Sequence, residues 1–360
     1  MAKIDKYFKI VLQNEASDLH LGSGAKPTMR KEGELIAIED EILLNDILQD
    51  MLFEIITAGQ KDIFIKRKEL DFSFEVPSGP RFRVNYYIGN RGICAAFRIV
   101  PVRIPSVKEL GLPEHILRFA DMSNGLVLVT GPTGCGKSTT LASIIDHINE
   151  TRKDHIITIE DPIEFAYKNK NCLINQRELG AHTNSFANAL RASLREDPDV
   201  ILVGEMRDLE TIELAITAAE TGQLVFATLH TPSAAQSVDR IIDVFPEGKQ
   251  AQIRTMLADT LKGIVAQQLL KRADKTGRIV AVEVLFVNYA VSNLIREGKT
   301  YQIPSVMQTS KQEQMQIMDE EIMKYLMHKI INPEEAYLKA NNKKLFSPYL
   351  TGDSHKGGAQ

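Results

Sequence analysis

Residues 126–138 read LVLVTGPTGCGKS and contain every position of the G-x-x-x-x-G-K-[ST] pattern known as a P-loop. The apolar run at residues 126–129 is predicted to form a strand, and a helix is predicted to begin near Gly136. Strand, glycine-rich turn and helix in this order form the structural context in which the pattern binds phosphate groups. The stretch therefore predicts an α/β domain that binds a nucleotide, rather than a chance glycine-rich turn.

The turn offers the phosphates both amide groups and a cation. Gly131, Gly134 and Gly136 allow backbone conformations in which a Cβ would clash, so successive amides converge on the phosphates at the positive end of the helix. Lys137 is predicted to contact the β- and γ-phosphates, and the Ser138 hydroxyl to bind Mg²⁺. We therefore expect hydrolysis of ATP with Mg²⁺. The predicted nucleotide-binding residues are Pro132, Thr133, Gly134, Cys135, Gly136, Lys137, Ser138 and Thr139.

The sequence around the P-loop has the pattern of a parallel sheet. Short apolar runs at residues 126–130, 155–160, 200–204 and 224–228 alternate with helical stretches. Continuous rather than alternating apolar strands are typical of sheets covered by helices on both faces. After about residue 291 the pattern becomes helical, at residues 317–331 and then 333–340.

The N-terminal part has a different pattern. Residues 17–21, 34–38, 71–76, 81–86 and 93–100 read as strands, with a helix at residues 45–57 and a hairpin turn at residues 77–80. Pro101, Pro105 and Pro113 then interrupt regular structure, which indicates a linker between domains. The predicted organisation is an N-terminal α/β domain at 1–98, a linker at 99–113, an ATPase core at 114–290, a C-terminal helical region at 291–350 and a disordered tail at 351–360.

Composition limits the possible classes of protein. The chain is 44% hydrophobic and 25% charged, as in ordinary soluble globular proteins, and no apolar run reaches the roughly 18 residues of a membrane span. The net charge of −4 does not favour binding along a nucleic acid, although it allows a local basic patch. The three cysteines form no Cys-x-x-Cys pair, so no zinc site is expected. Cys135 reads as a small tolerated residue, with a redox role as the alternative.

Two acidic segments are candidates for the chemistry of hydrolysis. Residues 199–205, DVILVGE, form an apolar strand that ends in Glu205, the position of a Walker B acid, and Glu205 is expected to support the Mg²⁺ shell through water. Residues 159–164, IEDPIE, carry three acids after another strand. Glu164 is predicted to activate the attacking water, and Glu160 joins Ser138 and Glu205 as a predicted metal ligand. The alternative for each acid is a helix cap or a surface charge, with Asp161 before Pro162 the best candidate for a cap.

His230 follows the strand at residues 224–228. In a parallel sheet the carboxyl ends of the strands form the edge where ligands bind, so this histidine is a candidate sensor of the γ-phosphate by hydrogen bonding. The alternative is a structural or exposed histidine.

Four stretches occur together in one order: the P-loop, residues 159–164, residues 194–208 (LREDPDVILVGEMRD) and residues 228–231 (TLHT). This combination resembles the secretion ATPase superfamily, whose members power type II secretion and type IV pili. The resemblance extends from residues 17–20 to residues 293–297 and is strongest to the type IV pilus retraction ATPases of twitching motility. Residues 290–297, AVSNLIRE, are similar to the C-terminal signature AIRNLIRE of that group and depart from it at Val291 and Ser292.

The resemblance implies a PAS-like N-terminal domain, a RecA-like P-loop domain with a mostly parallel sheet, and a homohexameric ring. It also implies that arginines of the N-terminal domain complete the nucleotide site; the matching positions are Arg81, Arg83 and Arg98, which otherwise read as strand-face charges. The implied partner is the inner-membrane pilus platform protein, engaged from the cytoplasm, so that the motor is cytoplasmic and associates with the membrane peripherally, without nucleic acid.

Three other functions fit parts of the sequence. A pilus-assembly or type II secretion ATPase shares the motifs, but these ATPases typically carry a further N-terminal domain and a four-cysteine zinc motif, and we expect neither here. A hexameric nucleic-acid translocase shares the core fold, and it would be expected to show a basic stripe. A non-catalytic nucleotide-sensing adaptor would bind ATP without hydrolysing it.

Overall fold

The computed structural model describes residues 2–31, 33–76, 79–101 and 103–350. The chain divides into two compact units, the first formed by Met1–Arg103 with Glu164–Ala166 and the second by Ile104–Ile163 with Tyr167–Gln360. Pro77 and Ser78 of the predicted hairpin turn and the tail predicted to be disordered at 351–360 lie outside the described residues.

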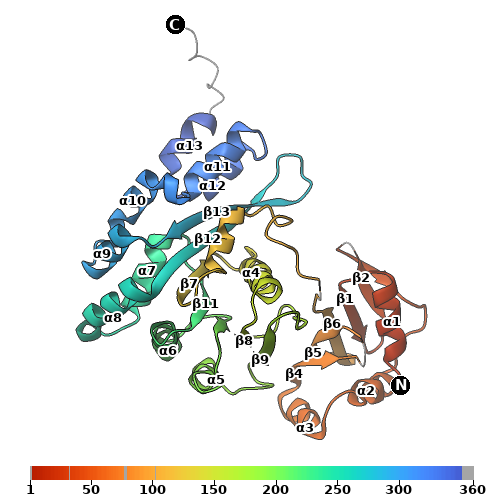
Figure 1. Cartoon of the computed structure of the whole chain (residues 1–360). Helices are drawn as coiled ribbons and strands as arrows, with labels where there is room; N and C mark the ends of the chain where they lie inside the picture. The colour runs from red at the N-terminus through yellow and green to blue at the C-terminus, as the bar shows by residue number, and fades with distance from the viewer. Residues whose placement is uncertain (1, 32, 77–78, 102, 351–360) are drawn as a thin grey trace. The chain divides into compact units, whose positions relative to one another are not determined.

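The first unit contains a six-stranded antiparallel sheet in the order β3-β2-β1-β6-β5-β4 (Figure 1). Its elements are α1 (Asp5–Gln13), β1 (Asp18–Gly22), β2 (Thr28–Lys31), β3 (Glu34–Ala37), α2 (Asn45–Phe53), α3 (Ala58–Arg67), β4 (Glu69–Glu75), β5 (Arg81–Gly89) and β6 (Gly92–Ile99). Aromatic side chains fill the core, where the rings of Phe8 and Phe82 stack with centroids 4.5 Å apart. The structure contains all the strands predicted for this unit, and they are β1, β3, β4, β5 and β6.

The sequence pattern did not identify α1, β2 or α3, and it extended α2 too far. The predicted helix at 45–57 ends at Phe53, because Thr57 begins the next helix as its N-cap. The Thr57 hydroxyl accepts a hydrogen bond from the Gln60 amide at 3.3 Å, and the Thr57 amide donates to Gln60 Oε1 at 2.9 Å. This reciprocal capping box marks a new helix start.

The second unit contains a seven-stranded sheet in the order β13-β12-β7-β11-β10-β8-β9. Its strands are β7 (Gly125–Thr130), β8 (His155–Glu160), β9 (Leu173–Glu178), β10 (Val200–Val203), β11 (Leu224–Leu229), β12 (Leu261–Lys271) and β13 (Arg278–Phe286). All neighbours pair in parallel except β12 and β13, which form a long antiparallel hairpin (Figure 1). The prediction of an α/β fold with a mostly parallel sheet is confirmed.

Helices complete the second unit. They are α4 (Lys137–Thr151), α5 (Phe186–Ser193), α6 (Leu209–Glu220), α7 (Ala234–Asp243), α8 (Glu247–Thr260), α9 (Tyr289–Arg296), α10 (Ile303–Thr309), α11 (Met318–Met327), α12 (Pro333–Lys339) and α13 (Lys343–Leu350), with 3₁₀ turns η1 (Glu114–Phe119), η2 (Thr300–Gln302) and η3 (Lys311–Glu313). The predicted helix at 317–331 is shorter than expected, because it ends at Met327 and Lys329 has a positive φ of 57°. None of the described helices combines the length and the apolarity that a bilayer-spanning segment requires.

A buried carboxyl group joins the C-terminal helices to the sheet. Glu283 of β13 accepts hydrogen bonds from the amide of Ala234, at the start of α7, at 2.7 Å and from the amide of Met318, at the start of α11, at 3.4 Å. Burial raises the pKa of Glu283 above its usual range, while the two amide hydrogen bonds act in the opposite direction. One side chain thus accepts the first backbone amide of two helices.

The sheet order decides which residues can form one site. The strands from β12 to β9 are parallel, so the carboxyl ends of β7, β11, β10 and β8 meet along one edge. The order along this edge, beginning with β12, is Gln267, the P-loop after β7, His230 after β11, Glu205 after β10 and Glu160 at the end of β8.

The β12 strand passes very close to η1 at Gly263. A Cβ at this position would lie 2.1 Å from Phe119 Cε1 and 2.6 Å from the carbonyl oxygen of Leu285. We therefore predict that Gly263→Ala lowers the free energy of unfolding by about 3 kcal/mol, the typical cost of overpacking a core. In Gly248→Ala, the added Cβ has no neighbour within 4 Å, so this control should stay within about 1 kcal/mol of the wild type in the same denaturant titration. Equal stability of the two variants would contradict the close packing of η1 on β12.

Candidate active site

The P-loop adopts the backbone conformation that its glycines allow. Gly131, Gly134 and Gly136 have φ angles of 138°, 76° and 94°. At Gly131 a Cβ would lie only 2.3 Å from the carbonyl oxygen of Gln267 on β12, so this position requires glycine for space as well as for conformation. The loop is thus held tightly against the neighbouring strand.

The start of α4 offers hydrogen-bond donors to an anion. Gly136 is the N-cap of α4, and no side chain caps the helix. The amides of a first helical turn have no partner within the helix, and together with the helix dipole they favour a phosphate group. The Lys137 ammonium lies over the same loop, where it donates to the carbonyl oxygens of Gly131 at 2.9 Å and Pro132 at 3.2 Å. The next residue, Ser138, is exposed.

Gln267 of β12 contacts this loop and was not identified from the sequence. Its side-chain nitrogen donates to the carbonyl oxygen of Cys135 at 2.7 Å, and its side-chain oxygen accepts from the Thr140 hydroxyl at 2.9 Å. The residue is 1% exposed. The available signal was a pair of glutamines in an otherwise apolar stretch, since a buried amide needs hydrogen-bond partners.

Cys135 faces the interior of the loop. Its side chain is buried, and burial raises the pKa of the thiol above its usual range although Lys137 acts against this. A buried, protonated thiol is a poor nucleophile, which agrees with the interpretation of Cys135 as a small tolerated residue.

Glu205 and His230 meet at the ends of two adjacent strands. The His230 ring nitrogen Nε2 lies 3.1 Å from Glu205 Oε1, and its other nitrogen, Nδ1, lies 3.5 Å from the Thr133 hydroxyl in the P-loop. Arg207 contacts the second carboxylate oxygen of Glu205 at 2.7 Å. A chain of polar contacts therefore runs from the P-loop through His230 and Glu205 to an exposed arginine.

The charge of Glu205 is set mainly by this arginine. The hydrogen bond from Arg207 lowers the pKa of Glu205 below its usual range, with partial burial acting in the opposite direction and His230 contributing in the same direction as Arg207. Glu205 is therefore ionised at neutral pH. Only an ionised carboxylate can support a divalent cation, so Glu205 meets this requirement of its predicted role.

The Glu160 carboxylate is buried and forms hydrogen bonds with neighbouring side chains. The residue is 8% exposed, and its Oε1 accepts hydrogen bonds from the Thr158 hydroxyl at 2.7 Å and from the Gln176 side chain at 3.0 Å. The alternative interpretation of Asp161 as a helix cap is wrong, because the chain forms no helix between Asp161 and β9.

The remaining predicted residues lie in the first unit. Arg83 on β5 and Arg98 on β6 are paired across the two strands, and Arg81 begins β5. Arg98 Nε donates to the buried Asp18 carboxylate at 2.7 Å, which gives this arginine a structural contact. The Arg83 guanidinium lies 3.9 Å from Glu164 Oε1, and the Glu164 side chain is 51% exposed. The structure thus places the predicted base beside one of the predicted arginines.

Among the described residues, no group of three or more histidine, cysteine or acidic side chains is arranged to hold a metal ion. Where Mg²⁺ binds with a nucleotide, it keeps several waters, takes further ligands from the phosphates and needs only one or two protein oxygens. The exposed Ser138 hydroxyl and the ionised Glu205 are suitable donors of that kind.

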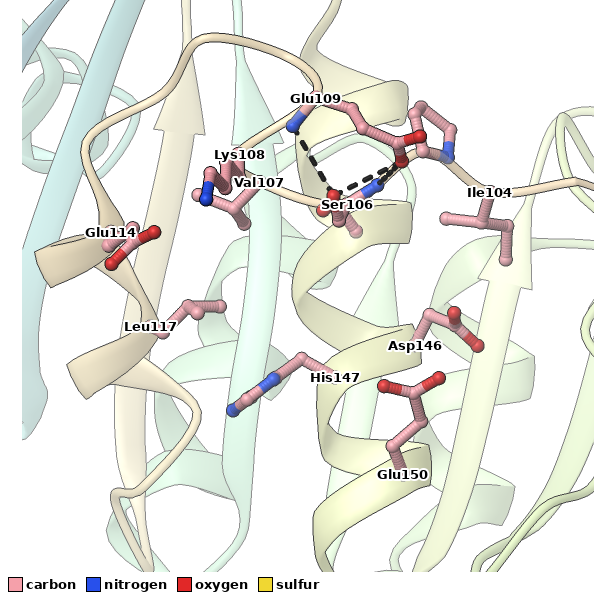
Figure 2. Close-up of a pocket in the computed structure, with 12 residues that line it drawn as sticks. Ile104, Ser106, Val107, Lys108, Glu109, Glu114, Leu117, Asp146, His147 and Glu150 are labelled. Atoms are coloured by element: carbon pink, nitrogen blue, oxygen red, sulfur yellow. Dashed lines mark hydrogen bonds between the residues drawn. The ribbon is translucent and has the colours of Figure 1, made fainter.

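A separate pocket of about 230 Å³ lies between residues 104–117 and the middle of α4 (Figure 2). Figure 2 shows Ser106 and Glu109 joined by hydrogen bonds, with Asp146 and Glu150 lower in the view. The lining includes four carboxylates, from Glu109, Glu114, Asp146 and Glu150, which disfavours a triphosphate. The P-loop residues do not line this pocket.

Ser292 has a local contact of its own in the C-terminal signature. Its hydroxyl donates to the carbonyl oxygen of Ala258, in the last turn of α8, at 2.9 Å. Arg296 of the same helix contacts Asp259 at 2.7 Å. Both contacts attach α9 to the end of α8.

The parallel sheet, the glycine-rich loop before α4 and the polar residues at adjacent strand ends define a P-loop ATPase. The chain belongs to the type II/IV secretion system protein family, whose model matches residues 2–345. Within this family it groups with the pilus retraction ATPases of twitching motility, which confirms the resemblance seen in the sequence.

Two bacterial relatives support the grouping with the pilus retraction ATPases. The chain is 50% identical over 321 residues to a twitching motility protein of Neisseria gonorrhoeae, covering 89% of this chain and 86% of the relative. It is 48% identical over 325 residues to a type IV pilus retraction ATPase of Pseudomonas aeruginosa, covering 90% and 94%.

Solved structures agree with the sequence comparison. The crystal structure of a pilus retraction motor with bound ADP superposes with a TM-score of 0.89 at 44% identity and covers 97% of this chain and 100% of that one. The ATPase DotB of Legionella pneumophila superposes with a TM-score of 0.74 at 28% identity, covering 93% and 94%.

The contact between Arg207 and Glu205 leads to a prediction about titration. Arg207→Ala should raise the pKa of Glu205 toward its ordinary value of about 4.3, because the main stabiliser of the carboxylate is removed. Since the native pKa is lowered, the contribution of this pair to stability is complete above the ordinary pKa and is lost as the pH falls through the native pKa. Carbon NMR of the glutamate carboxyls measures the shift, with Arg195→Ala as the control. An unchanged Glu205 titration in Arg207→Ala would contradict the assignment.

Proposed function

We propose that this chain forms a homohexameric motor that hydrolyses Mg-ATP at the P-loop and uses the energy to retract type IV pili. The observation that supports hydrolysis most directly is the uncapped start of α4 together with an ionised Glu205, which His230 connects to the P-loop residue Thr133. The membership in the pilus retraction group supports the mechanical role.

The P-loop residues are proposed to hold the triphosphate. Lys137, which donates to loop carbonyls at 2.9 and 3.2 Å, would exchange these acceptors for the more strongly charged phosphate oxygens. Residues Pro132 to Thr139 would surround the phosphates with amides and hydroxyls. Mg²⁺, held by Ser138 with support from Glu205 and Glu160, would neutralise charge on the phosphate oxygens. Glu160 would act through its neighbours, because Thr158 and Gln176 already occupy one of its oxygens.

Glu164 is proposed to activate the attacking water. Its carboxylate is half exposed, so it is accessible to water, and the Arg83 guanidinium lies close enough to orient it. His230 is proposed to report the state of the nucleotide, because it contacts both the P-loop residue Thr133 and Glu205.

Arginines of the first unit are proposed to stabilise negative charge in the transition state. Arg83 is half exposed and well suited to this role. Arg98 is held by Asp18, and Arg81 begins the same strand as Arg83. Movement of these arginines with the domain that carries them would couple hydrolysis to mechanical work.

The proposed partner is the pilus platform protein of the inner membrane, engaged from the cytoplasm. Association with the membrane would then be peripheral and would depend on the partner. The net charge of −4 does not favour a nucleic acid as the track of this motor.

Removing the proposed catalytic charges should stop turnover. Lys137→Ala and Glu164→Gln are each expected to lower the rate of ATP hydrolysis by about 100-fold or more, while the ring still assembles. Phosphate release measures the rate, and light scattering after size-exclusion chromatography measures the assembly. Lys153→Ala, which removes a lysine just after α4, is the control and should hydrolyse ATP normally. A normal rate in either Lys137→Ala or Glu164→Gln would refute the assigned role.

The direction of the motor can be tested in the cell. Deletion of the gene should leave cells with an excess of pili that cannot twitch, because assembly continues without retraction. Electron microscopy counts the pili, and spreading on agar measures twitching. Cells without pili would instead indicate an assembly or secretion ATPase.

A further inference from the structure

We propose that Gln267 is a positioning residue for the nucleotide, which orients the Cys135–Gly136 peptide so that its amide faces the phosphates. This inference rests on the proposed function of the P-loop in binding ATP and adds a residue outside the motif. It is carried by the contacts of β12 with the loop.

The position of Gln267 follows from strand pairing. In the parallel ladder of β12 with β7, Ala266 is the partner of Thr130, the last residue of β7. Gln267 therefore lies at the level of Gly131, where the strand gives way to the loop. Its own carbonyl oxygen lies so close to Gly131 that a Cβ there would approach it to 2.3 Å. The backbone and the side chain of Gln267 both face the loop.

The two hydrogen bonds of Gln267 define how its amide is oriented. The carbonyl oxygen of Cys135 can only accept, so the side-chain nitrogen of Gln267 must face it, at 2.7 Å. The side-chain oxygen then receives the Thr140 hydroxyl, at 2.9 Å. Because Thr140 lies in the first turns of α4, Gln267 ties the end of the loop to the helix that follows it.

The geometry of the Cys135–Gly136 peptide links this contact to the direction of the Gly136 amide. In a trans peptide the carbonyl and the amide of the same plane point in opposite directions. Gln267 holds the Cys135 carbonyl toward β12, so the Gly136 amide of the same plane points away from β12, toward the concave side of the loop. Convergent amides of this kind are what bind phosphate in a P-loop. The Gln267 side chain also lies close to Gly136, because a Cβ there would lie 3.3 Å from its nitrogen.

An amide that binds phosphate in both the ground state and the transition state affects affinity more than turnover. The expected signature of Gln267 is therefore a weaker affinity for nucleotide with nearly unchanged kcat. A residue that only stabilises the fold would lower the active fraction, and hence kcat, without changing the affinity of the molecules that remain folded.

The test compares Gln267→Met with Gln268→Met. Gln268 is the adjacent residue of β12 and is also buried, but its side chain points to the opposite face of the sheet. Calorimetric titration with ADP and steady-state kinetics with Mg-ATP are measured on the full chain. Gln267→Met should raise the Kd for ADP and the KM for ATP by about tenfold, the effect of one buried hydrogen bond, with kcat within about twofold. Gln268→Met should match the wild type in both constants.

Two further variants identify which contact matters. Gln267→Glu keeps an acceptor for Thr140 but has no donor for the Cys135 carbonyl, and its carboxylate would repel the phosphates, so it should weaken ADP binding at least as much as Gln267→Met. Thr140→Val removes only the hydroxyl and should weaken binding less, by about threefold. These variants also provide the test if Gln267→Met does not fold.

The outcomes separate this inference from the proposed function. An unchanged Kd in Gln267→Glu, or equal affinities in Gln267→Met and Gln268→Met, would overturn the role of Gln267 while the wild type still hydrolysed ATP. A change in kcat alone would also overturn it. Absence of ATP hydrolysis by the wild type would instead overturn the proposed function.

Discussion

The parallel pairing of β7 with β11 on one side and β12 on the other is the constraint on which the active site depends. The hydrogen-bonded registers place Leu229 beside Thr130 on one side and Ala266 beside Thr130 on the other. His230 and Gln267 thereby lie on the two flanks of the P-loop. The loop could not keep its shape if either neighbour shifted by one residue, because such a shift would turn the side chains to the opposite face. The geometry of the site is thus a result of strand register.

Much of the second unit was predictable from local patterns. Continuous apolar runs identified β7, β8, β10 and β11, and the rule that parallel strands share a ligand edge correctly predicted that Glu205 and His230 lie near the P-loop. The glycine pattern predicted the loop itself. These predictions succeeded because each depends on residues that are close in sequence or on a general rule for parallel sheets.

Other features depend on contacts between distant residues, and local patterns do not show them. Nothing near Gln267 indicates that β12 is the neighbour of β7, since the two strands are separated by more than a hundred residues in the sequence. Glu160 reads as an available ligand, whereas the structure shows its oxygen engaged by Thr158 and Gln176. β2 and α3 gave no clear signal, because each buries only one side chain. The missed helix α1 does bury Tyr7, Phe8 and Val11 at helical spacing, so its pattern was present in the sequence.

The buried carboxylate of Glu283 has a mechanical consequence for the second unit. It receives the amides that begin α7 and α11, and α7 starts only four residues after His230. A displacement of the segment after His230 must therefore either carry β13 and α11 along or leave a buried acceptor without its donor, at a cost of about 1–3 kcal/mol. Glu283 therefore links the segment after His230 to β13 and to the start of α11.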